Sequence, residues 1–239
     1  MNKIITHIPH ASLNGIFDPQ IGKWQKNAFF VNDEVMQLTD LYVDMLFATE
    51  RTNVTPIVFN HSRFVCDVER LIDDPMEKEG QGIIYTHYKG YKRGELSEDA
   101  KDVLMDIWGL HQQRLVNEID EYRDTIILDC HSFSGKVTDS DICIGYNDDS
   151  TYSAKLVGEI ADTFVGRGYS VSFNDPYSNS IAPTTHKRYK SVMIEVNKRV
   201  YMASGYRTLS YDPKLWTRWY GTTERLFERL SNIEVTHQQ

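Results

Sequence analysis

Short runs of apolar residues recur along the chain, separated by longer segments whose apolar residues follow helical spacing. The runs predict six β-strands, at residues 3–6, 54–59, 125–129, 141–145, 169–173 and 191–196. Two of them, IILDC and VMIEV, are continuously apolar around one acidic residue rather than alternating. This pattern is typical of strands that are buried on both faces of a sheet.

The segments between these runs predict four helices, at residues 33–49, 98–122, 152–167 and 213–230. Ser97 is a good N-cap for the second helix, because Glu98 and Asp99 then fall in its first turn. Gly168 suits the end of the third helix. Strands that alternate with helices indicate a three-layer α/β/α sandwich with a mixed, mainly parallel sheet. No repeat or flexible linker interrupts the pattern, so we expect one domain over residues 1–239.

Charge and cysteine content narrow the possible classes of protein. The 239 residues include 26 Lys and Arg against 34 Asp and Glu, a net charge of −8. This balance argues against binding to a nucleic-acid backbone, which needs a basic face. The three cysteines are scattered and odd in number, so we expect reduced thiols and a cytoplasmic protein. We expect no signal peptide and no membrane span, because the apolar runs are far shorter than the roughly 18–20 residues required.

Three of the predicted strands lead into or contain residues suited to catalysis. His7 and His10 follow the first strand, Asp129 and His131 lie at the end of the third, and Glu195 lies within the last. A single histidine at a strand end is more often structural than catalytic. However, a buried carboxylate is costly unless it is paired or binds a ligand. Because the carboxyl ends of parallel strands meet at one edge of the sheet, these residues can converge on one site.

A fourth cluster, SRFVCDVER at residues 62–70, follows the second strand. Its two arginines, Arg63 and Arg70, could bind a carboxylate or stabilise an oxyanion. The cluster could equally be a structural network of ion pairs, between Arg63 and Asp67 or between Glu69 and Arg70.

Together these segments resemble the N-formylglutamate amidohydrolase family. The matching stretches are residues 7–12 (HIPHAS), 38–47 (LTDLYVDMLF), 62–70 (SRFVCDVER), 80–86 (GQGIIYT), 128–132 (LDCHS), 141–145 (DICIG), 176–183 (PYSNSIAP) and 193–202 (MIEVNKRVYM). The resemblance implies a fold related to zinc carboxypeptidases and aspartoacylases. It also implies a zinc-dependent hydrolase of small anionic N-acyl amino acids, with a place in histidine degradation. Its expected substrate is above all N-formyl-L-glutamate, which it would split to formate and glutamate.

The resemblance also implies the metal ligands. His10 matches the histidine of the first loop and His131 the later histidine. The wider superfamily has a glutamate three residues after the first histidine, where this chain has Leu13. Another residue must therefore complete the site, and Asp40 is the first choice. The alternatives are Asp44, His7 and Tyr42.

A mechanism follows from these residue types. A catalytic zinc site has three protein ligands and one water. Glu195 is the best candidate to take a proton from that water and to deliver it to the leaving amine. Arg63 would stabilise the oxyanion together with the zinc. Asp129 shares a strand face with His131 and could orient its ring.

The expected substrate-binding residues are Arg70, Tyr177 and Asn197. Arg70 would bind a substrate carboxylate, and Tyr177 could close over the substrate. Formylglutamate hydrolases often have a PYKGG-like loop where this chain has PYSNS, and Glu69 stands where the wider superfamily often has asparagine. Both differences concern the region that would bind the substrate. They leave open a second enzyme hypothesis, a zinc peptidase or amidase that acts on a small peptide or cell-wall fragment.

A third hypothesis is a metal-free binding protein on the same fold, which only the missing glutamate favours.

Cys130 should point away from its neighbour His131, because adjacent strand residues face opposite sides. Four histidines are expected at the surface or in structural roles, namely His87, His111, His186 and His237, whereas His61 could line the cleft. A solvated face is expected for Lys187, Arg188 and Lys198, although they could instead add positive charge to the cleft.

Overall fold

A six-stranded mixed sheet forms the centre of the molecule in the computed structural model, which describes residues 1–16, 18, 20, 24, 35–135, 137–203 and 210–235. The strand order is β2-β1-β5-β8-β6-β7. Strands β2, β1, β5 and β8 run parallel, whereas β6 is antiparallel to β8 and parallel to β7. Their bounds are β1 Lys3–Ile8, β2 Val54–Val58, β5 Thr125–Phe133, β6 Ile142–Gly145, β7 Val171–Phe173 and β8 Lys190–Asn197. All six predicted strands are confirmed.

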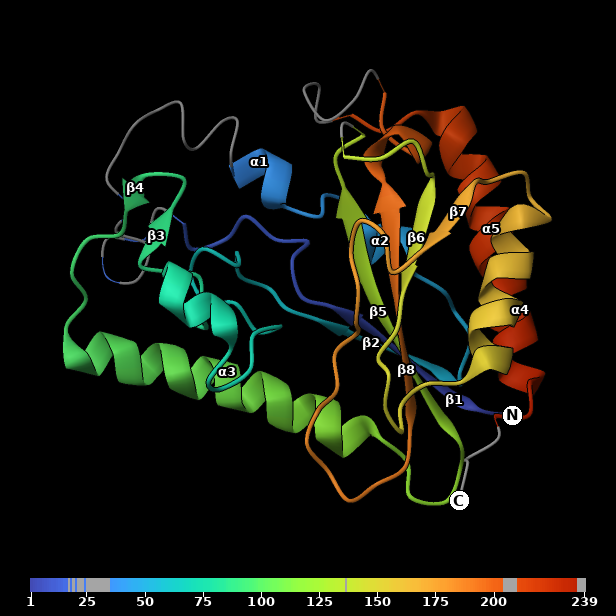
Figure 1. The fold of residues 1–239 in the computed structure, drawn as a ribbon, viewed down its shortest axis with the longest axis horizontal. Coiled ribbons are helices and arrows are strands. Elements are labelled where there is room, and N and C mark those ends of the chain that lie inside the picture. Colours follow the sequence, from blue (N-terminus) through green and yellow to red (C-terminus); the bar gives the residue numbers. More distant parts are fainter. Residues whose placement is uncertain are drawn as a thin grey trace.

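Helices cover both faces of this sheet, as the pattern of alternating elements predicts. Helices α4 (Ala154–Val165) and α5 (Pro213–Asn232) lie side by side against one face, and α3 (Glu98–Glu118) lies on the other side (Figure 1). A hairpin of β3 (His87–Tyr88) and β4 (Tyr91–Lys92), which the sequence analysis did not identify, stands apart from the sheet. Two short 3-10 helices occupy Pro75–Glu79 and Lys198–Val200. The mixed, mainly parallel sandwich is thereby confirmed.

The predicted helix at residues 33–49 is wrong. Residues 33 and 34 lie outside the described residues, and the remainder forms two single-turn helices, α1 (Val35–Leu38) and α2 (Val43–Leu46). Between them Tyr42 adopts a left-handed conformation with φ of 66°. The backbone N–H of Asp40 donates to the carbonyl of His10 instead of continuing a helix. The apolar spacing is compatible with a helix, but the helix is interrupted because the backbone of Asp40 pairs with the loop that follows β1.

The central strands sort their side chains onto two faces. Even-numbered residues of β5 and β8, such as Leu128, Cys130 and Ile194, pack in the large core beneath α4 and α5. Odd-numbered neighbours face α3, where Ile127 joins a smaller apolar cluster with Leu115 of α3. Every residue of β5 and β8 is buried. Cys130 and His131 therefore face opposite sides of the sheet, as predicted.

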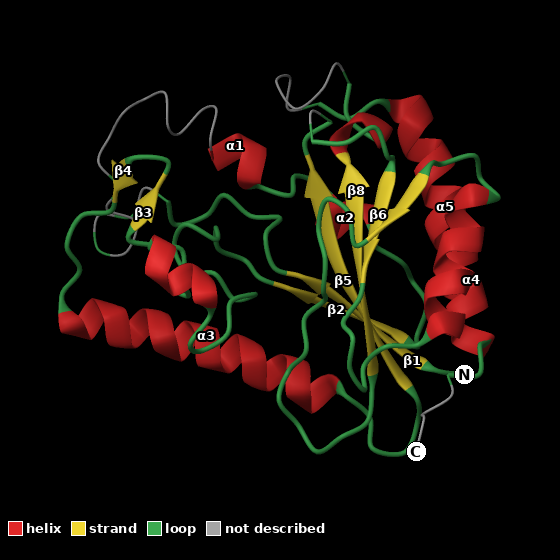
Figure 2. Ribbon diagram, viewed as in Figure 1, coloured by secondary structure: helices red, strands yellow, loops and turns green. Residues whose placement is uncertain are grey.

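Much of the space between α3 and the sheet is occupied by loops rather than by regular elements (Figure 2). These loops lead from β1 and β2, and they carry the histidine of the first loop and the arginine cluster. Among the described residues, none of the helices combines the length and apolar character that crossing a bilayer requires.

The N-cap of α3 gives a direct test of how local sequence stabilises this fold. The Ser97 hydroxyl accepts a hydrogen bond from the backbone N–H of Ala100 at 3.2 Å, as the sequence predicts. We expect Ser97→Ala to lower the free energy of unfolding by about 1 kcal/mol, because the first turn loses an acceptor. Ser97→Gly should cost only a few tenths of that. Urea unfolding of the three proteins measures both values, and equal losses would contradict the capping role.

Candidate active site

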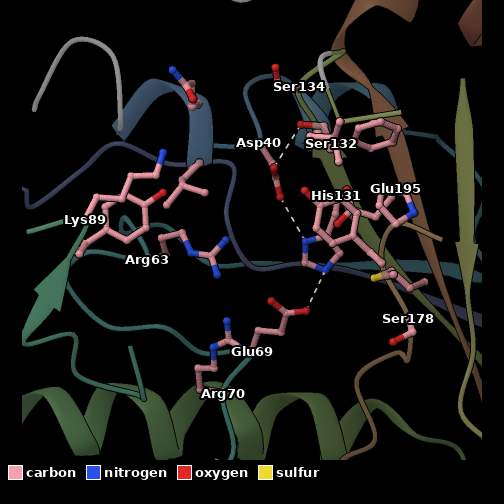
Figure 3. Close-up of a pocket in the computed structure, with 18 residues that line it drawn as sticks. Asp40, Arg63, Glu69, Arg70, Lys89, His131, Ser132, Ser134, Ser178 and Glu195 are labelled. Carbon is pink, nitrogen blue, oxygen red and sulfur yellow. Dashed lines mark hydrogen bonds and ion pairs between the residues drawn. The ribbon is translucent and has the colours of Figure 1, made fainter. Parts of the chain in front are cut away.

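A cavity of about 530 Å³ opens on the side of the sheet that faces α3. It is lined by His131 of β5, Glu195 of β8, Asp40 of the α1–α2 turn and the loop residues Arg63 and Arg70 (Figure 3). His131 and Glu195 are register partners on adjacent parallel strands. The odd-numbered face of the sheet and the loop after β2 therefore converge here, as the sequence analysis predicts.

Two histidines of the site are each held through Nε2 by a buried carboxylate. The Nε2 atom of His10 lies 2.8 Å from Oδ1 of Asp67. The Nε2 atom of His131 lies 3.1 Å from Oδ1 of Asp129. A carboxylate on one ring nitrogen fixes the imidazole tautomer and leaves the other nitrogen as a potential ligand. Both rings therefore present Nδ1 for further chemistry.

Asp40 lies on the Nδ1 side of both rings. Its Oδ2 atom is 3.2 Å from Nδ1 of His131 and 3.8 Å from Nδ1 of His10. The hydroxyl of Ser132 donates to the other carboxylate oxygen at 3.1 Å. Burial would raise the pKa of Asp40, but His131 and His10 lower it below its ordinary value. Asp40 is thus held as a carboxylate between two imidazoles.

The donor atoms of His10, Asp40 and His131 all lie within 4.8 Å of one another. Two nitrogens and a carboxylate oxygen are the ligand set that zinc takes in catalytic sites. The Nδ1 atom of His10 is buried and has no hydrogen-bond partner among the described residues. A buried polar atom without a partner is costly. The residues present therefore fit a metal ion.

Glu69 offers a second carboxylate to the same histidines. It lies 3.4 Å from Nε2 of His131 and 3.7 Å from Nε2 of His10, and it approaches the His131 ring from the side opposite Asp40 (Figure 3). Asp67 and Asp129 already occupy these Nε2 atoms at shorter distances. Asp40 is therefore the better placed third ligand.

The alternatives to Asp40 are positioned less favourably. Asp44 is exposed on α2, and the ring of Tyr42 packs against Tyr211 and Trp216. His7 is 2.7 Å from Asp129 and does not belong to any of the candidate metal groups among the described residues.

Both arginines of the cluster line the cavity, and both are paired with one carboxylate, which confirms the predicted ion pair between Arg63 and Asp67. Arg63 donates from Nη2 to Oδ2 of Asp67 at 2.9 Å, and Arg70 lies 3.7 Å from the same oxygen. The hydroxyl of Tyr85 donates to that oxygen at 2.8 Å. Burial would raise the pKa of Asp67, but Arg63 and His10 hold it well below its usual range. The sequence analysis missed both Asp67 as the histidine's partner and Tyr85.

Glu195 is buried at the cavity wall, and its Oε2 atom has no hydrogen-bond partner among the described residues. Burial raises the pKa of Glu195 to about 8, and the nearby carboxylate of Asp40 adds to this rise against the opposing effect of His131. A carboxyl group with a pKa near the working pH can both accept and return a proton. The environment of Glu195 is therefore that of a general acid–base group.

The three predicted substrate-binding residues are placed differently. Arg70 and Tyr177 line the cavity. Asn197 is not among the lining residues: its side chain donates to the carbonyl of Ser140 at 3.0 Å and accepts from the N–H of Arg199. It therefore caps the turn after β8. Lys198, expected on a solvated face, is 1% exposed and donates to the carbonyl of Gln37, so that expectation is wrong.

His111, assigned to surface or structure, lies next to the site. Its Nε2 atom is 3.0 Å from Nε2 of His7, whose Nδ1 atom is 2.7 Å from Asp129. Burial lowers the pKa of His111 to about 3, so its ring is neutral at pH 7. No local pattern distinguishes this histidine, because its neighbours are His7 of β1 and Phe59, which follows β2. His87 and His186 are exposed, His61 is not a lining residue, and His237 lies outside the described residues.

Comparisons with known proteins bear on the family and the fold of this chain. The sequence matches the family model of N-formylglutamate amidohydrolases over residues 3–202. No curated protein matches the sequence. The crystal structure of N-formylglutamate amidohydrolase from Ralstonia eutropha JMP134 is 17% identical, with a TM-score of 0.65 over 96% of this chain and 93% of that chain. Gene product Atu2144 from Agrobacterium tumefaciens is 18% identical, with a TM-score of 0.68 over 96% and 91%. Both structures share the fold.

Proposed function

Because the chain belongs to the N-formylglutamate amidohydrolase family, we propose that it is a zinc-dependent hydrolase that cleaves N-formyl-L-glutamate or a similar N-acyl amino acid. One observation carries this proposal. Two imidazoles, each held at Nε2 by a buried carboxylate, turn Nδ1 toward Asp40 beside the buried carboxyl group of Glu195. Metal ligands and an acid–base group with a raised pKa thus share one cavity.

Each residue has a role that its position supports. His10, His131 and Asp40 would hold the zinc, which when bound supplies an acidic water and polarises a carbonyl. Glu195 takes a proton from the attacking water and returns it to the leaving amine. Arg63, kept charged by Asp67, stabilises the oxyanion. Arg70 binds a carboxylate of the substrate.

The decisive assay measures amine release from a panel of N-acyl amino acids by the zinc-loaded protein, with N-formyl-L-glutamate first. A chelator should remove both the zinc and the activity. About one zinc per chain with hydrolysis supports the proposal. A chain that binds no zinc and hydrolyses none of the substrates would support the metal-free binding protein instead.

A neighbouring cavity favours keeping the peptide substrate as a second candidate. This cavity of about 330 Å³ shares Glu69, Arg70, Ser178 and Met193 with the main one. The two together could take a substrate longer than N-formyl-L-glutamate. Including short N-acylated peptides in the panel separates the candidates, since a peptidase would release peptide products in preference to free glutamate.

The metal ligands can be tested by comparing two carboxylates. We expect Asp40→Ala to lose most of its bound zinc on dialysis, because it removes one of three ligands. Glu69→Ala should keep about one zinc per chain, because Asp67 and Asp129 still hold both histidines. Metal content of the purified variants gives the answer. Zinc loss in the Glu69 variant alone would assign the third ligand to Glu69.

A reducing cellular compartment is also part of the proposal. Cys66, Cys130 and Cys143 are buried and unpaired, which supports a reducing compartment such as the cytoplasm. A place in histidine degradation stays a prediction.

A further inference from the structure

A buried row of polar side chains connects α3 with the proposed metal centre. It runs from His111 of α3 through His7 of β1 to Asp129 of β5, and ends at His131. The successive distances are 3.0 Å between the two Nε2 atoms of His111 and His7, 2.7 Å from Nδ1 of His7 to Oδ1 of Asp129, and 3.1 Å from that oxygen to Nε2 of His131. His7 and Asp129 are fully buried, and His111 is 7% exposed.

The proton positions in this row follow from the groups that meet. Asp129 acts as an acceptor, because its Oδ1 atom faces a ring nitrogen of both His131 and His7 and its Oδ2 atom accepts the backbone N–H of Ile181. His7 then donates to Asp129 from Nδ1, and an imidazole with a single proton at Nδ1 has an acceptor at Nε2. Only a donor can satisfy that acceptor at 3.0 Å, which assigns the proton of His111 to Nε2. The donors therefore point in one direction, toward Asp129.

Asp129 and His111, on either side of His7, are fixed in position. The other oxygen of Asp129 accepts the backbone N–H of Ile181 at 2.8 Å. The ring of His111 packs edge-on against Phe59, with centroids 5.4 Å apart. One turn further along α3, Leu115 is buried in the apolar cluster on this face of the sheet. His111 thus presents its N–H to His7 from a firmly packed helix.

We propose that His111 is a positioning residue for the metal centre: its Nε2–H holds the His7 ring in the orientation in which Nδ1 meets Asp129, and His7 in turn holds Asp129 against His131. This inference rests on the proposed function, since it assigns His131 as a ligand. Without the donor, the buried Nε2 atom of His7 is unsatisfied, and the ring can turn away from Asp129 to reach another donor. Asp129 then loses one of its N–H donors and orients His131 less firmly.

The tautomers can be observed directly in the metal-free wild-type protein labelled with ¹⁵N-histidine. Long-range ¹H–¹⁵N correlation spectra should show His111 protonated at Nε2 and His7 protonated at Nδ1. Detection of the Nδ1–H tautomer of His111, or of the Nε2–H tautomer of His7, would overturn the proposal whatever the substrate of the enzyme is.

Two substitutions separate hydrogen bonding from packing. His111→Gln keeps an N–H donor of similar reach, whereas His111→Phe keeps the aromatic contact and removes the donor. Loss of a residue that directly supports a metal ligand typically weakens metal binding by about 10–100-fold. Because His111 acts one step further out, we expect the Phe variant to bind zinc about three- to tenfold more weakly in a chelator competition. The Gln variant should bind within about twofold of wild type.

His186→Phe is the matched control, because the side chain of His186 is 87% exposed. It should leave zinc affinity unchanged. If His111→Phe binds zinc like wild type, or if His111→Gln is the weaker of the two, the residue serves packing and the proposal fails. A wild-type chain that binds no zinc would reject the proposed function itself. If the Phe variant does not fold, the Gln variant and the wild-type tautomers still decide the question.

Discussion

Replacing Glu195 by glutamine is expected to lower kcat by about 10²–10⁴-fold, the range typical of a lost general acid–base group. Glutamine has nearly the same shape, so the cavity should keep its form. However, an amide cannot accept the proton of an attacking water and return it to the amine. Zinc content should stay near one per chain, because Glu195 is not one of the candidate metal ligands. Steady-state kinetics and metal analysis on the same preparation measure both effects.

Glu69→Gln is the matched control for this change, since Glu69 is a second carboxylate on the cavity wall. It should retain much more activity than the Glu195 variant, because Glu69 is partly exposed and faces Nε2 atoms that Asp67 and Asp129 already occupy. A near-normal kcat for Glu195→Gln would remove Glu195 from the proton-transfer role. A larger loss in the Glu69 variant would transfer that role to Glu69.

The second large effect is expected for His131→Ala, which should lose both its zinc and its hydrolytic activity. Activity should fall by at least about 10³-fold, because the acidic bound water and several kcal/mol of charge stabilisation are lost together. The variant also leaves Asp40 without the partner that lies 3.2 Å from it. Metal analysis after dialysis, followed by an assay with added zinc, measures the loss.

The same substitution at His87, which is exposed on β3, is the control and should leave zinc content and activity unchanged. Asp129→Asn should fall between the two, with a loss of about 10–100-fold, because it weakens the support of His131 without removing the ligand. A His131→Ala protein that keeps both zinc and hydrolysis would contradict the site described above.

The sheet could be predicted from sequence because its strands are local features. The buried strands β5 and β8 require continuous apolar runs, and the rule that parallel strands end at one edge brings His131 and Glu195 together. No local feature of the sequence shows that the predicted helix at residues 33–49 is interrupted. Its interruption depends on a hydrogen bond from Asp40 to His10, thirty residues earlier in the chain.

The partners of the site residues were harder to predict than the residues themselves. The resemblance points to His10, His131 and Asp40, but nothing in the local sequence connects His111 with His7 or Tyr85 with Asp67. These contacts join separate segments that only the folded chain brings together. Asn197 and Lys198 show the opposite error. Asn197 is of a type that suggests substrate binding, yet it caps the turn after β8. Lys198 is of a type that suggests exposure to solvent, yet it is buried.

The alternation of faces along β5 and β8 has a consequence for how this protein can evolve. Mutations at Leu128, Cys130 or Ile194 alter the packing beneath α4 and α5, whereas mutations at Asp129, His131 or Glu195 alter the proposed active site. Selection can therefore adjust stability and catalysis through different codons of the same strands. A deletion of one codon would exchange the two faces and destroy both properties at once. Such strands should tolerate many substitutions but no length changes, which is consistent with a fold shared at 17% identity.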